Sequence, residues 1–405
     1  MGMRTGMIGV GLVLLFAVTA ADAEAIPAFA RKYHVSCSLC HGPVPRLTSF
    51  GETFAANGFE FQPGEAPRDT IQTGDPLLRL QADLPLAIRF DGYMSGWTEA
   101  PQDGTSWDLE TPWAIKLLTG GQITNRVSYY LYFFMFERGE VAGLEDAYLQ
   151  FTDLFSSGVS VIAGQFQVSD PLFKRELRLE FEDYAPYRVR VGNATADLTY
   201  ERGLMGMMSP WNGGDLVLGI ANGQGLAGTN AARQFDVDNG KTVFARLSHS
   251  FSAVRVGGFG YYNSQRSAAG AVDETVVWGP DATLALGNMG ELNVELLRRT
   301  DSNPAFLALP PGAHAKTDMG LAELVLWPQG QAGRLFWTAL YNHVRARDGV
   351  PFTLRLGEPG PLLKYDYVAG GVHYLLVRNV RLMTEVGLDI NEGEGRLTLG
   401  LVTAF

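Results

Sequence analysis

The feature that most constrains the fold is a two-residue alternation of apolar and polar side chains, repeated in segments of about ten residues from Leu84 onward. One such segment places aliphatic or small side chains on one face and charged ones on the other: Leu382, Thr384, Val386, Leu388 and Ile390 alternate with Arg381, Glu385 and Asp389. Side chains two residues apart share one face of a strand, so each segment predicts a strand with one apolar face. Strands of this length and pattern are typical of a closed barrel that crosses a membrane.

The links from odd-numbered to even-numbered predicted strands are mostly long, and those from even-numbered to odd-numbered strands are short. The long links are 96–107, 168–197, 223–241, 264–273, 301–316 and 346–364, and the short ones are 124–126, 153–157, 211–214, 251–253, 287–290, 328–333 and 378–379. Outer-membrane barrels show this asymmetry, with long external loops and tight periplasmic turns. The count predicts a mainly β fold, a 16-stranded antiparallel outer-membrane β-barrel over residues 77–405 with both termini periplasmic. A soluble β protein is the alternative, but the terminal Phe405 resembles the assembly signal of bacterial outer-membrane proteins.

The N-terminus has the layout of a secretory signal peptide. Arg4 precedes an uncharged, mainly apolar run over residues 7–21, and either Ala21-Asp22-Ala23 or Ala23-Glu24-Ala25 offers a small-x-small cleavage site. A run of fifteen residues is short for a membrane-spanning helix, which needs about 20. We therefore expect residues 1–23 to be removed on export, with an uncleaved anchor as the alternative.

The sequence Cys37-Ser38-Leu39-Cys40-His41 has the Cys-x-x-Cys-His spacing by which c-type haem is attached. Two thiols separated by one turn of backbone match the two vinyl groups of haem, and the adjacent histidine reaches the iron as proximal ligand. The alternative is a thioredoxin-type redox pair, but no βαβ pattern surrounds the motif. Because the chain has no other cysteine, we expect one covalently bound haem c, held by Cys37, Cys40 and His41.

Aromatic and aliphatic residues surround this motif: Phe29, Tyr33, Leu47, Phe50, Phe54 and Phe59. Leu47, Phe50 and Phe54 have helical spacing, and Asn57-Gly58 is a plausible helix end. A domain over residues 24–76 is too small to fold without a cofactor or a partner surface. We therefore expect a small helical haem domain and linker that rests on the barrel.

The sixth ligand of the iron stays open at this stage. His34 lies three residues before Cys37 and is one candidate for the metal site, since no methionine follows His41 before Met94. An open or water-bound position is a second possibility. A barrel residue, such as Met205 or Met207, is a third.

The link 168–197 carries a dense mixture of charges between residues 170 and 190. The segment contains five acidic residues, Asp170, Glu176, Glu180, Glu182 and Asp183, and five basic residues, Lys174, Arg175, Arg178, Arg188 and Arg190. This segment resembles the porin loop that follows the fifth strand and folds inward. Inside a lumen such charges must pair, because isolated buried charges are costly. An exposed loop with neutralised charges is the alternative.

Four blocks near the N-terminus resemble the fused cytochrome–porins, the monohaem outer-membrane cytochromes of iron-oxidising bacteria. They are Pro-x-Phe-Ala-Arg at 27–31, Cys-x-x-Cys-His at 37–41, Pro-x-Leu-x-x-Phe-Gly at 45–51 and Asn-Gly-Phe at 57–59. The resemblance implies electron flow from extracellular Fe(II), through one haem, to periplasmic carriers such as a cytochrome c or a copper protein. It implies an electron-transfer oxidoreductase rather than a hydrolase or transferase. The barrel half carries no motif of this family.

The net charge of −11 argues against a nucleic-acid partner and favours cations near the surface. The apolar band of an outer-membrane barrel is about 25 Å tall, so one haem must lie within the barrel, or on its periplasmic side, to shorten electron transfer. We expect the haem domain to act as a lumen plug. Two alternatives remain: outward electron transfer to an external acceptor, and an ion-diffusion porin plugged by the haem domain.

Overall fold

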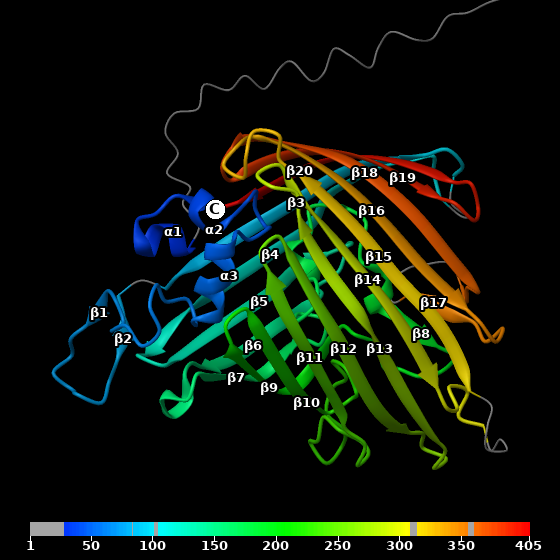
Figure 1. Ribbon diagram of the computed structural model, residues 1–405, viewed down its shortest axis with the longest axis horizontal. Helices are drawn as coiled ribbons and strands as arrows, with labels where there is room; N and C mark the ends of the chain where they lie inside the picture. Colours follow the sequence, from blue (N-terminus) through cyan, green and yellow to red (C-terminus); the bar gives the residue numbers. More distant parts are fainter. Residues whose placement is uncertain (1–27, 83, 101–103, 308–313, 355–359) are drawn as a thin grey trace, which may run out of the picture.

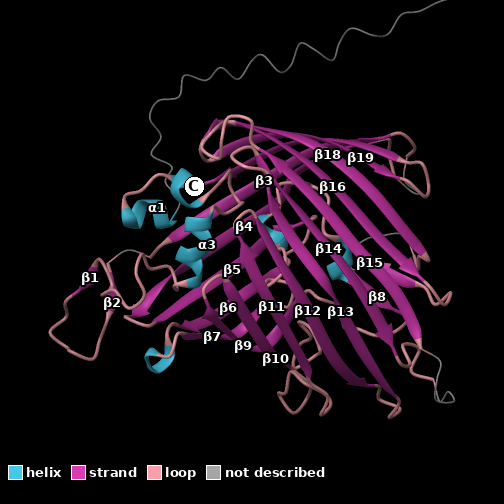
Figure 2. Ribbon diagram, in the orientation of Figure 1, coloured by secondary structure: helices cyan, strands magenta, loops and turns pink. Residues whose placement is uncertain are grey.

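The computed structural model describes residues 28–82, 84–100, 104–307, 314–354 and 360–405. The expected signal peptide, residues 1–23, lies outside the described residues. Short helices come first in the described chain and long strands follow (Figure 2). No helix among the described residues has the length and apolar character that a membrane-spanning helix requires.

Within the described part of the chain, sixteen strands close into one antiparallel barrel (Figure 1). They are β3 (Leu86–Trp97), β4 (Trp107–Thr124), β5 (Val127–Glu137), β6 (Gly143–Phe151), β7 (Val159–Gln167), β9 (Tyr200–Trp211), β10 (Gly214–Ala221), β11 (Thr242–Phe251), β12 (Val254–Arg266), β13 (Val272–Ala285), β14 (Gly290–Asp301), β15 (Ala315–Leu326), β16 (Leu335–Ala346), β18 (Lys364–Val377), β19 (Val380–Asp389) and β20 (Gly395–Ala404). Strand β20 pairs with β3 and closes the ring. The predicted number of strands is confirmed.

Short turns gather at one end of the barrel and long links at the other. Turns as short as Thr124 to Val127 and Val377 to Val380 join neighbouring strands at the short-turn end. The first strand begins and the last strand finishes at this same end, where the C-terminus lies beside the N-terminal helices (Figure 1). Three links at the opposite end, 138–142, 267–271 and 390–394, are short as well, so the predicted asymmetry is confirmed for most links and is wrong for 264–273.

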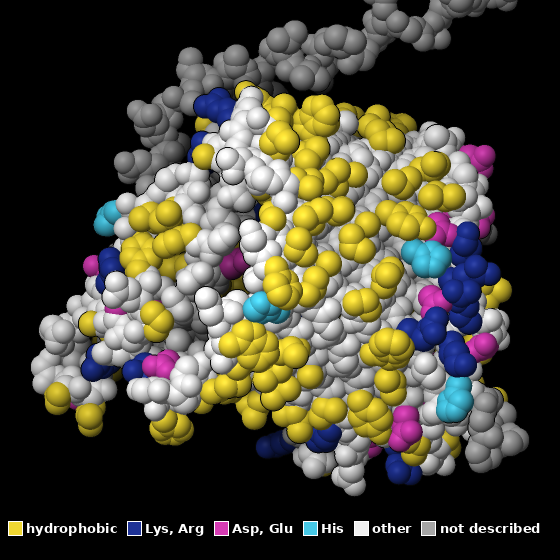
Figure 3. Space-filling model, viewed as in Figure 1, with side chains coloured by type: hydrophobic (Ala, Val, Ile, Leu, Met, Phe, Trp, Pro, Cys, Tyr) yellow, Lys and Arg dark blue, Asp and Glu magenta, His cyan; other side chains and the backbone are white. Residues whose placement is uncertain are grey.

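The outer face of the barrel is apolar and exposed, while the inner face carries the buried polar residues. On β19, Leu382, Val386 and Leu388 are exposed, whereas Arg381 and Glu385 are buried. Figure 3 shows hydrophobic side chains spread over the visible outer face of the barrel, and charged side chains mainly near its right-hand and lower edges. An apolar outer surface around a polar interior is what lipid requires of a membrane-spanning barrel.

The link between β7 and β9 folds into the lumen. It contains two 3₁₀ turns, Arg175–Leu177 and Ala185–Arg188, and strand β8 (Val189–Val191). Strand β8 pairs with β17 (Phe352–Leu354), which belongs to the link between β16 and β18. Buried apolar residues of the inward segment pack against inward-facing residues of the barrel strands. The predicted inward course is confirmed, and the exposed-loop alternative is wrong.

The charges of this inward segment are largely paired, as predicted. Four ion pairs illustrate this: Lys174–Asp170 at 3.0 Å, Arg175–Asp183 at 2.5 Å, Arg190–Asp197 at 2.8 Å and Arg396–Glu182 at 2.9 Å. Arg396 belongs to β20, so pairing ties the segment to the barrel wall as well as to itself. Pairing of this kind offsets part of the cost of taking charges out of water.

The N-terminal segment forms three short helices, α1 (Ala28–Tyr33), α2 (Cys37–Cys40) and α3 (Ser49–Ala56). The Thr48 side chain accepts a hydrogen bond from the Gly51 amide and begins α3, as N-cap residues do. Helix α3 ends at Ala56 with Asn57 as its C-cap, and Gly58 follows with φ +75°, a conformation that glycine adopts readily. The predicted helix end is confirmed. A small pair of strands, β1 (Thr70–Ile71) and β2 (Leu80–Gln81), follows between α3 and the barrel. The sequence did not predict this pair.

The N-terminal segment reaches across the short-turn mouth of the barrel. Phe59 stacks on Tyr130 of β5, with ring centroids 5.5 Å apart. Arg46 forms ion pairs with Glu291 of β14 and Glu323 of β15. Strands β5 and β14 are eight positions apart in the closed order of sixteen, so they lie opposite each other. The segment therefore contacts the lumen wall on two opposite sides.

Candidate functional site

An apolar cavity lies between the N-terminal segment and the inner wall of the barrel. The segment contributes residues such as Phe29, Tyr33 and Phe59, and the barrel contributes Ile88, Leu118, Tyr130 and Tyr132. The cavity has a volume of about 250 Å³, whereas one buried water molecule needs only about 10–15 Å³. The cavity therefore has room for a large apolar group.

Both cysteines line this cavity. Cys37 and Cys40 begin and end α2, which is a single turn, and they form no disulfide. The Ser36 side chain caps the turn by accepting a hydrogen bond from the Ser38 amide at 3.3 Å. Burial raises the pKa of both thiols, so at neutral pH they are protonated thiols rather than thiolates. The turn presents two thiols, three residues apart, to one apolar space.

The imidazole of His41 also lines the cavity. Its Nδ1 lies 3.1 Å from the carbonyl oxygen of Pro45. A carbonyl only accepts hydrogen bonds, so the neutral ring carries its proton on Nδ1 and leaves Nε2 with a free lone pair. Burial lowers the pKa of His41, which favours this neutral form. Metal-binding histidines are commonly oriented by such a contact to a backbone carbonyl.

Helix α3 packs directly on the cysteine turn. A Cβ atom on Gly51 would lie 2.2 Å from the carbonyl oxygen of Cys40, so only glycine allows this approach. The Thr48 amide donates a hydrogen bond to that same carbonyl at 2.9 Å, and the Thr48 hydroxyl donates one to the carbonyl of Leu39 at 2.7 Å. These contacts hold α2 and α3 in one arrangement beside the cavity.

The other sequence candidates lie elsewhere. His34 is exposed, adopts φ 54° and does not line the cavity. Met205 is buried in the apolar core of the lumen and Met207 packs against that core, and neither lines the cavity. Phe50, expected to wrap the motif, is 39% exposed. Among the described residues, no group of three or more His, Cys, Asp or Glu side chains gathers as a metal site.

Sequence reasoning named Lys174 and Glu176 as charges of the inward link, but it did not single out Arg89 or place any of the three beside the cysteines. Arg89 of β3, together with Lys174 and Glu176 of the inward segment, lines the cavity. Alternation within the first strand places Arg89 on the inner face, but it does not say which inner residues stand beside Cys37 and Cys40. That proximity depends on how the N-terminal segment enters the barrel.

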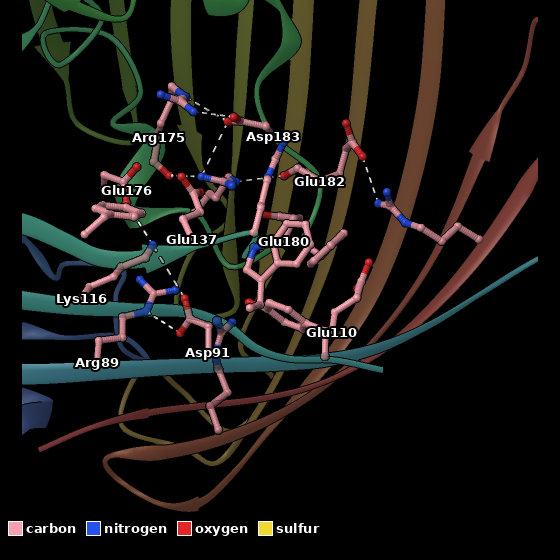
Figure 4. A pocket seen from close by; sticks show the side chains of 18 of the residues that line it. Arg89, Asp91, Glu110, Lys116, Glu137, Arg175, Glu176, Glu180, Glu182 and Asp183 are labelled. Carbon is pink, nitrogen blue, oxygen red and sulfur yellow. Dashed lines mark hydrogen bonds and ion pairs between the residues drawn. The ribbon is translucent and has the colours of Figure 1, made fainter. Parts of the chain in front are cut away.

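A second, polar cavity adjoins the first (Figure 4); we call it the lumen cleft. It extends from Trp97 and Glu110, near the long-link ends of β3 and β4, to Arg89 and Glu176, which line both cavities. Figure 4 shows Arg89, Asp91 and Lys116 close together on the strands of the wall, with Glu176 near Lys116. The distance from Arg89 Nε to Asp91 Oδ1 is 2.8 Å, and from Lys116 Nζ to Glu176 Oε2 it is 3.5 Å.

The lumen cleft is not acidic, although the whole chain is. Eight basic and seven acidic residues line it. The overall charge of −11 is therefore not reproduced on the surface that connects the long-link end to the apolar cavity. The charge of the chain alone does not identify a cation route through the lumen.

Several solved porins have a similar fold. An anion-selective porin from Comamonas acidovorans aligns with a TM-score of 0.56 and 9% identity, over 80% of this chain and 99% of that chain. A loop L8 deletion mutant of OmpT from Vibrio cholerae gives 0.53 and 11%, with 80% and 99% covered. Salmonella typhi OmpF, in a complex with daunomycin, gives 0.52 and 13%, with 80% and 97% covered.

No known protein family and no curated protein matches the chain. At identities of 9–13% the likeness to porins concerns the fold. The class is therefore an outer-membrane type of β-barrel with porin architecture. In this chain the N-terminal helical segment brings Cys37, Cys40 and His41 to an apolar cavity at the short-turn mouth.

Proposed function

We propose that the protein holds one haem c, attached through Cys37 and Cys40, with His41 as the proximal ligand of the iron. One observation carries the proposal: Cys37, Cys40 and His41 all line a single apolar cavity, and the contact of His41 Nδ1 with the Pro45 carbonyl leaves Nε2 as the nitrogen that can bind a metal. Bound there, haem supplies a one-electron carrier whose potential depends on its ligands and surroundings. In this reading the N-terminal segment, residues 24–76, is a haem domain that acts as a lumen plug at the periplasmic mouth.

The function that fits this site is electron transfer across the outer membrane. In this proposal one electron leaves extracellular Fe(II), which becomes Fe(III), and reduces a periplasmic carrier such as a cytochrome c or a copper protein. Two features support it: the motifs at 27–59 that resemble the fused cytochrome–porins, and the lumen cleft, which runs from the long-link end to the cavity wall. The protein is then an oxidoreductase with a soluble iron ion as its donor.

The chain itself has three tasks in this mechanism. The aromatic rings of Phe29, Phe54 and Phe59, with Tyr130 of the barrel, form an apolar wall of the cavity. Pro45 holds the His41 ring in the tautomer that offers Nε2 to a metal. The barrel spans the apolar layer, which a soluble carrier does not cross, and holds the site at its short-turn mouth.

Haem staining of the denatured protein tests the cofactor. We expect staining that survives denaturation, at one haem per chain, and its loss when Cys37 and Cys40 are both replaced by Ala. His34→Ala is the matched control, because His34 is exposed and lies outside the cavity. Persistent staining in the double variant would overturn the assignment.

Electron transfer is tested with the purified holoprotein in liposomes that contain a trapped oxidant. We expect external Fe(II) to reduce the haem faster than an equally reducing but bulky reagent does. An electron transfer that proceeds only from inside to outside would instead establish the outward direction.

A second candidate function is an ion-diffusion porin in which the haem domain serves as a plug. Two observations favour this second function. The barrel has porin architecture, and the lumen cleft has a volume of about 200 Å³. Planar-bilayer conductance separates the two functions. A barrel that conducts ions readily while Fe(II) leaves its haem oxidised is a plugged porin.

A further inference from the structure

We propose that Arg89 binds a propionate carboxylate of the haem, so that the carboxylate edge of the cofactor faces the lumen cleft. This inference rests on the proposed function, because it presupposes a haem attached at Cys37 and Cys40. In haem c the thioether bonds form at the vinyl groups on one side of the porphyrin, and both propionates project from another side. A cavity that holds the cysteines on one wall must therefore accommodate carboxylates on a different wall.

The charged residues of the cavity lie on such a different wall. Both cysteines belong to the N-terminal segment, whereas Arg89 belongs to β3 and Lys174 and Glu176 belong to the inward segment. These three are the only Asp, Glu, Lys or Arg residues among the described residues of the lining. A carboxylate in an apolar cavity needs a paired cation, because an isolated buried charge is expensive.

Arg89 has N–H groups that donate no hydrogen bond to a described residue. Its Nε donates a hydrogen bond to Asp91 Oδ1 at 2.8 Å, and that is its only hydrogen bond within the described parts of the chain. The two terminal nitrogens carry four further N–H groups, and a planar guanidinium binds a carboxylate with two parallel hydrogen bonds. Asp91 fixes the arginine from one side and leaves its outer edge to an anion in the cavity.

The surroundings of Arg89 hold surplus positive charge. Lys116 lies 3.7 Å from Asp91 and 3.5 Å from Glu176, so Arg89 and Lys116 are matched by these two carboxylates. Arg381 is buried within electrostatic range of Arg89, makes no ion pair with any described residue, and has an Nε without a hydrogen-bond partner. Burial and the neighbouring Glu323 raise the pKa of Glu180, which lessens its share of negative charge. Glu137 also acts on Lys116, but the lumen cleft as a whole has eight basic and seven acidic lining residues, so one more anion fits its charge balance.

Lys174 is a less suitable anchor. Its Nζ lies 3.0 Å from Asp170 Oδ2. Asp170 and Asp146 both lie within electrostatic range of Lys174, so two carboxyl groups already stand beside the lysine. A propionate placed there would have to compete with them for the ammonium group. The charge balance therefore selects Arg89.

The anion has two possible sources, a haem propionate or a solute anion that enters the lumen cleft. The experiment uses the full-length holoprotein and measures the haem midpoint potential for the wild type, Arg89→Gln, Arg89→Lys and Arg396→Gln. Arg396 is the matched control, since it is a partly buried lumen arginine that lines the cleft but not the haem cavity. Each protein is measured in low and high chloride, and resonance Raman spectra record the propionate-bending bands.

We expect Arg89→Gln to lower the potential by the equivalent of a tenfold change in the reduction equilibrium, about 59 mV for one electron. Loss of the cation stabilises oxidised haem, which carries the extra positive charge. The propionate-bending bands should shift in the same variant, Arg89→Lys should lie in between, and Arg396→Gln should match the wild type.

Unchanged potential and unchanged bending bands in Arg89→Gln would overturn the inference. So would a wild-type potential that follows the chloride concentration while the bands stay fixed, because the anion is then a solute. If Arg89→Gln does not assemble, the inference is tested by the potential and bending bands of Arg89→Lys and by the pH dependence of the wild-type bending bands. A wild type without covalent haem removes the proposed function itself, whereas covalent haem that is indifferent to Arg89 removes only this inference.

Discussion

Arg46 and Glu323 are 277 residues apart in the chain, yet Nη1 of Arg46 lies 3.2 Å from Oε2 of Glu323. Their side chains are 13% and 1% exposed. Glu323 also accepts hydrogen bonds from the Tyr184 hydroxyl at 2.5 Å and from the Asn293 amide at 2.7 Å. A single carboxylate of β15 thus joins the cysteine-bearing segment, the inward segment and the barrel wall.

We expect Arg46→Gln to loosen the N-terminal segment while the barrel stays folded. Removal of one partner from a buried ion pair costs about 3–5 kcal/mol, because the other charge stays buried and uncompensated. Limited proteolysis should then cut the linker near residues 62–80, while the barrel still migrates as a folded species on unheated gels. Arg68→Gln is the control, since Arg68 is 44% exposed in its pair with Glu65 and exposed pairs contribute about 0–1 kcal/mol. Equal cleavage of both variants would contradict the anchoring role of Arg46.

Replacement of His41 and of His34 should have different effects. His41 lines the cavity and its Nδ1 is held by Pro45, so His41→Ala should change the haem absorption spectrum. His34 is exposed and outside the cavity, so His34→Ala should leave the spectrum unchanged. A spectral change in His34→Ala would identify His34 as the sixth ligand.

The terminal Phe405 closes the barrel. Its amide donates to the Ile88 carbonyl at 2.8 Å, and its carbonyl accepts from the Ile88 amide at 2.7 Å. Deletion removes both hydrogen bonds at the seam between β20 and β3, so we expect less heat-resistant barrel in the membrane. Haem attachment is chemistry of the N-terminal segment and should continue. Phe405→Trp, which keeps the backbone and an aromatic ring, should assemble normally; equal loss in both variants would point to the ring rather than the seam.

The inward segment should limit conductance. Residues between β7 and β9 fill the lumen with an apolar core and are clasped through the pairing of β8 with β17. Replacement of residues 170–198 by a short Gly-Ser link should raise single-channel conductance in planar bilayers several-fold. A comparable shortening of 224–240, the link between β10 and β11 at the same end, is the control. Equal conductance in wild type and deletion would show that ions bypass the segment.

Epitope tags test the orientation of the barrel. A tag within the long link 223–241 should be labelled on intact cells, because long links face outward in such barrels. A tag at residues 378–379, in the tight turn between β18 and β19, should be labelled only after the outer membrane is opened. The opposite pattern would invert the topology and place the cysteine turn outside the cell.

The local sequence determined the strands, their number and the asymmetry of their links. Residues such as Leu382 and Glu385 fall on opposite faces because backbone geometry alternates side chains strictly, whatever the rest of the chain does. The same holds for the cysteine turn and for the end of α3 at Asn57 and Gly58, where short-range hydrogen bonds and glycine's backbone freedom decide. These features depend on neighbours a few residues away.

Only the tertiary structure decided which residues meet inside the barrel. Arg89 lines the cavity of Cys37 and Cys40, about fifty residues away in the chain. Arg46 reaches Glu323, and β8 pairs with β17, each across more than one hundred and fifty residues. Alternation assigns a side chain to the inner face, but closure of sixteen strands sets its depth and its opposite neighbour. Such contacts arise only once the ring has closed around the segments that fold into it, and no local pattern encodes them.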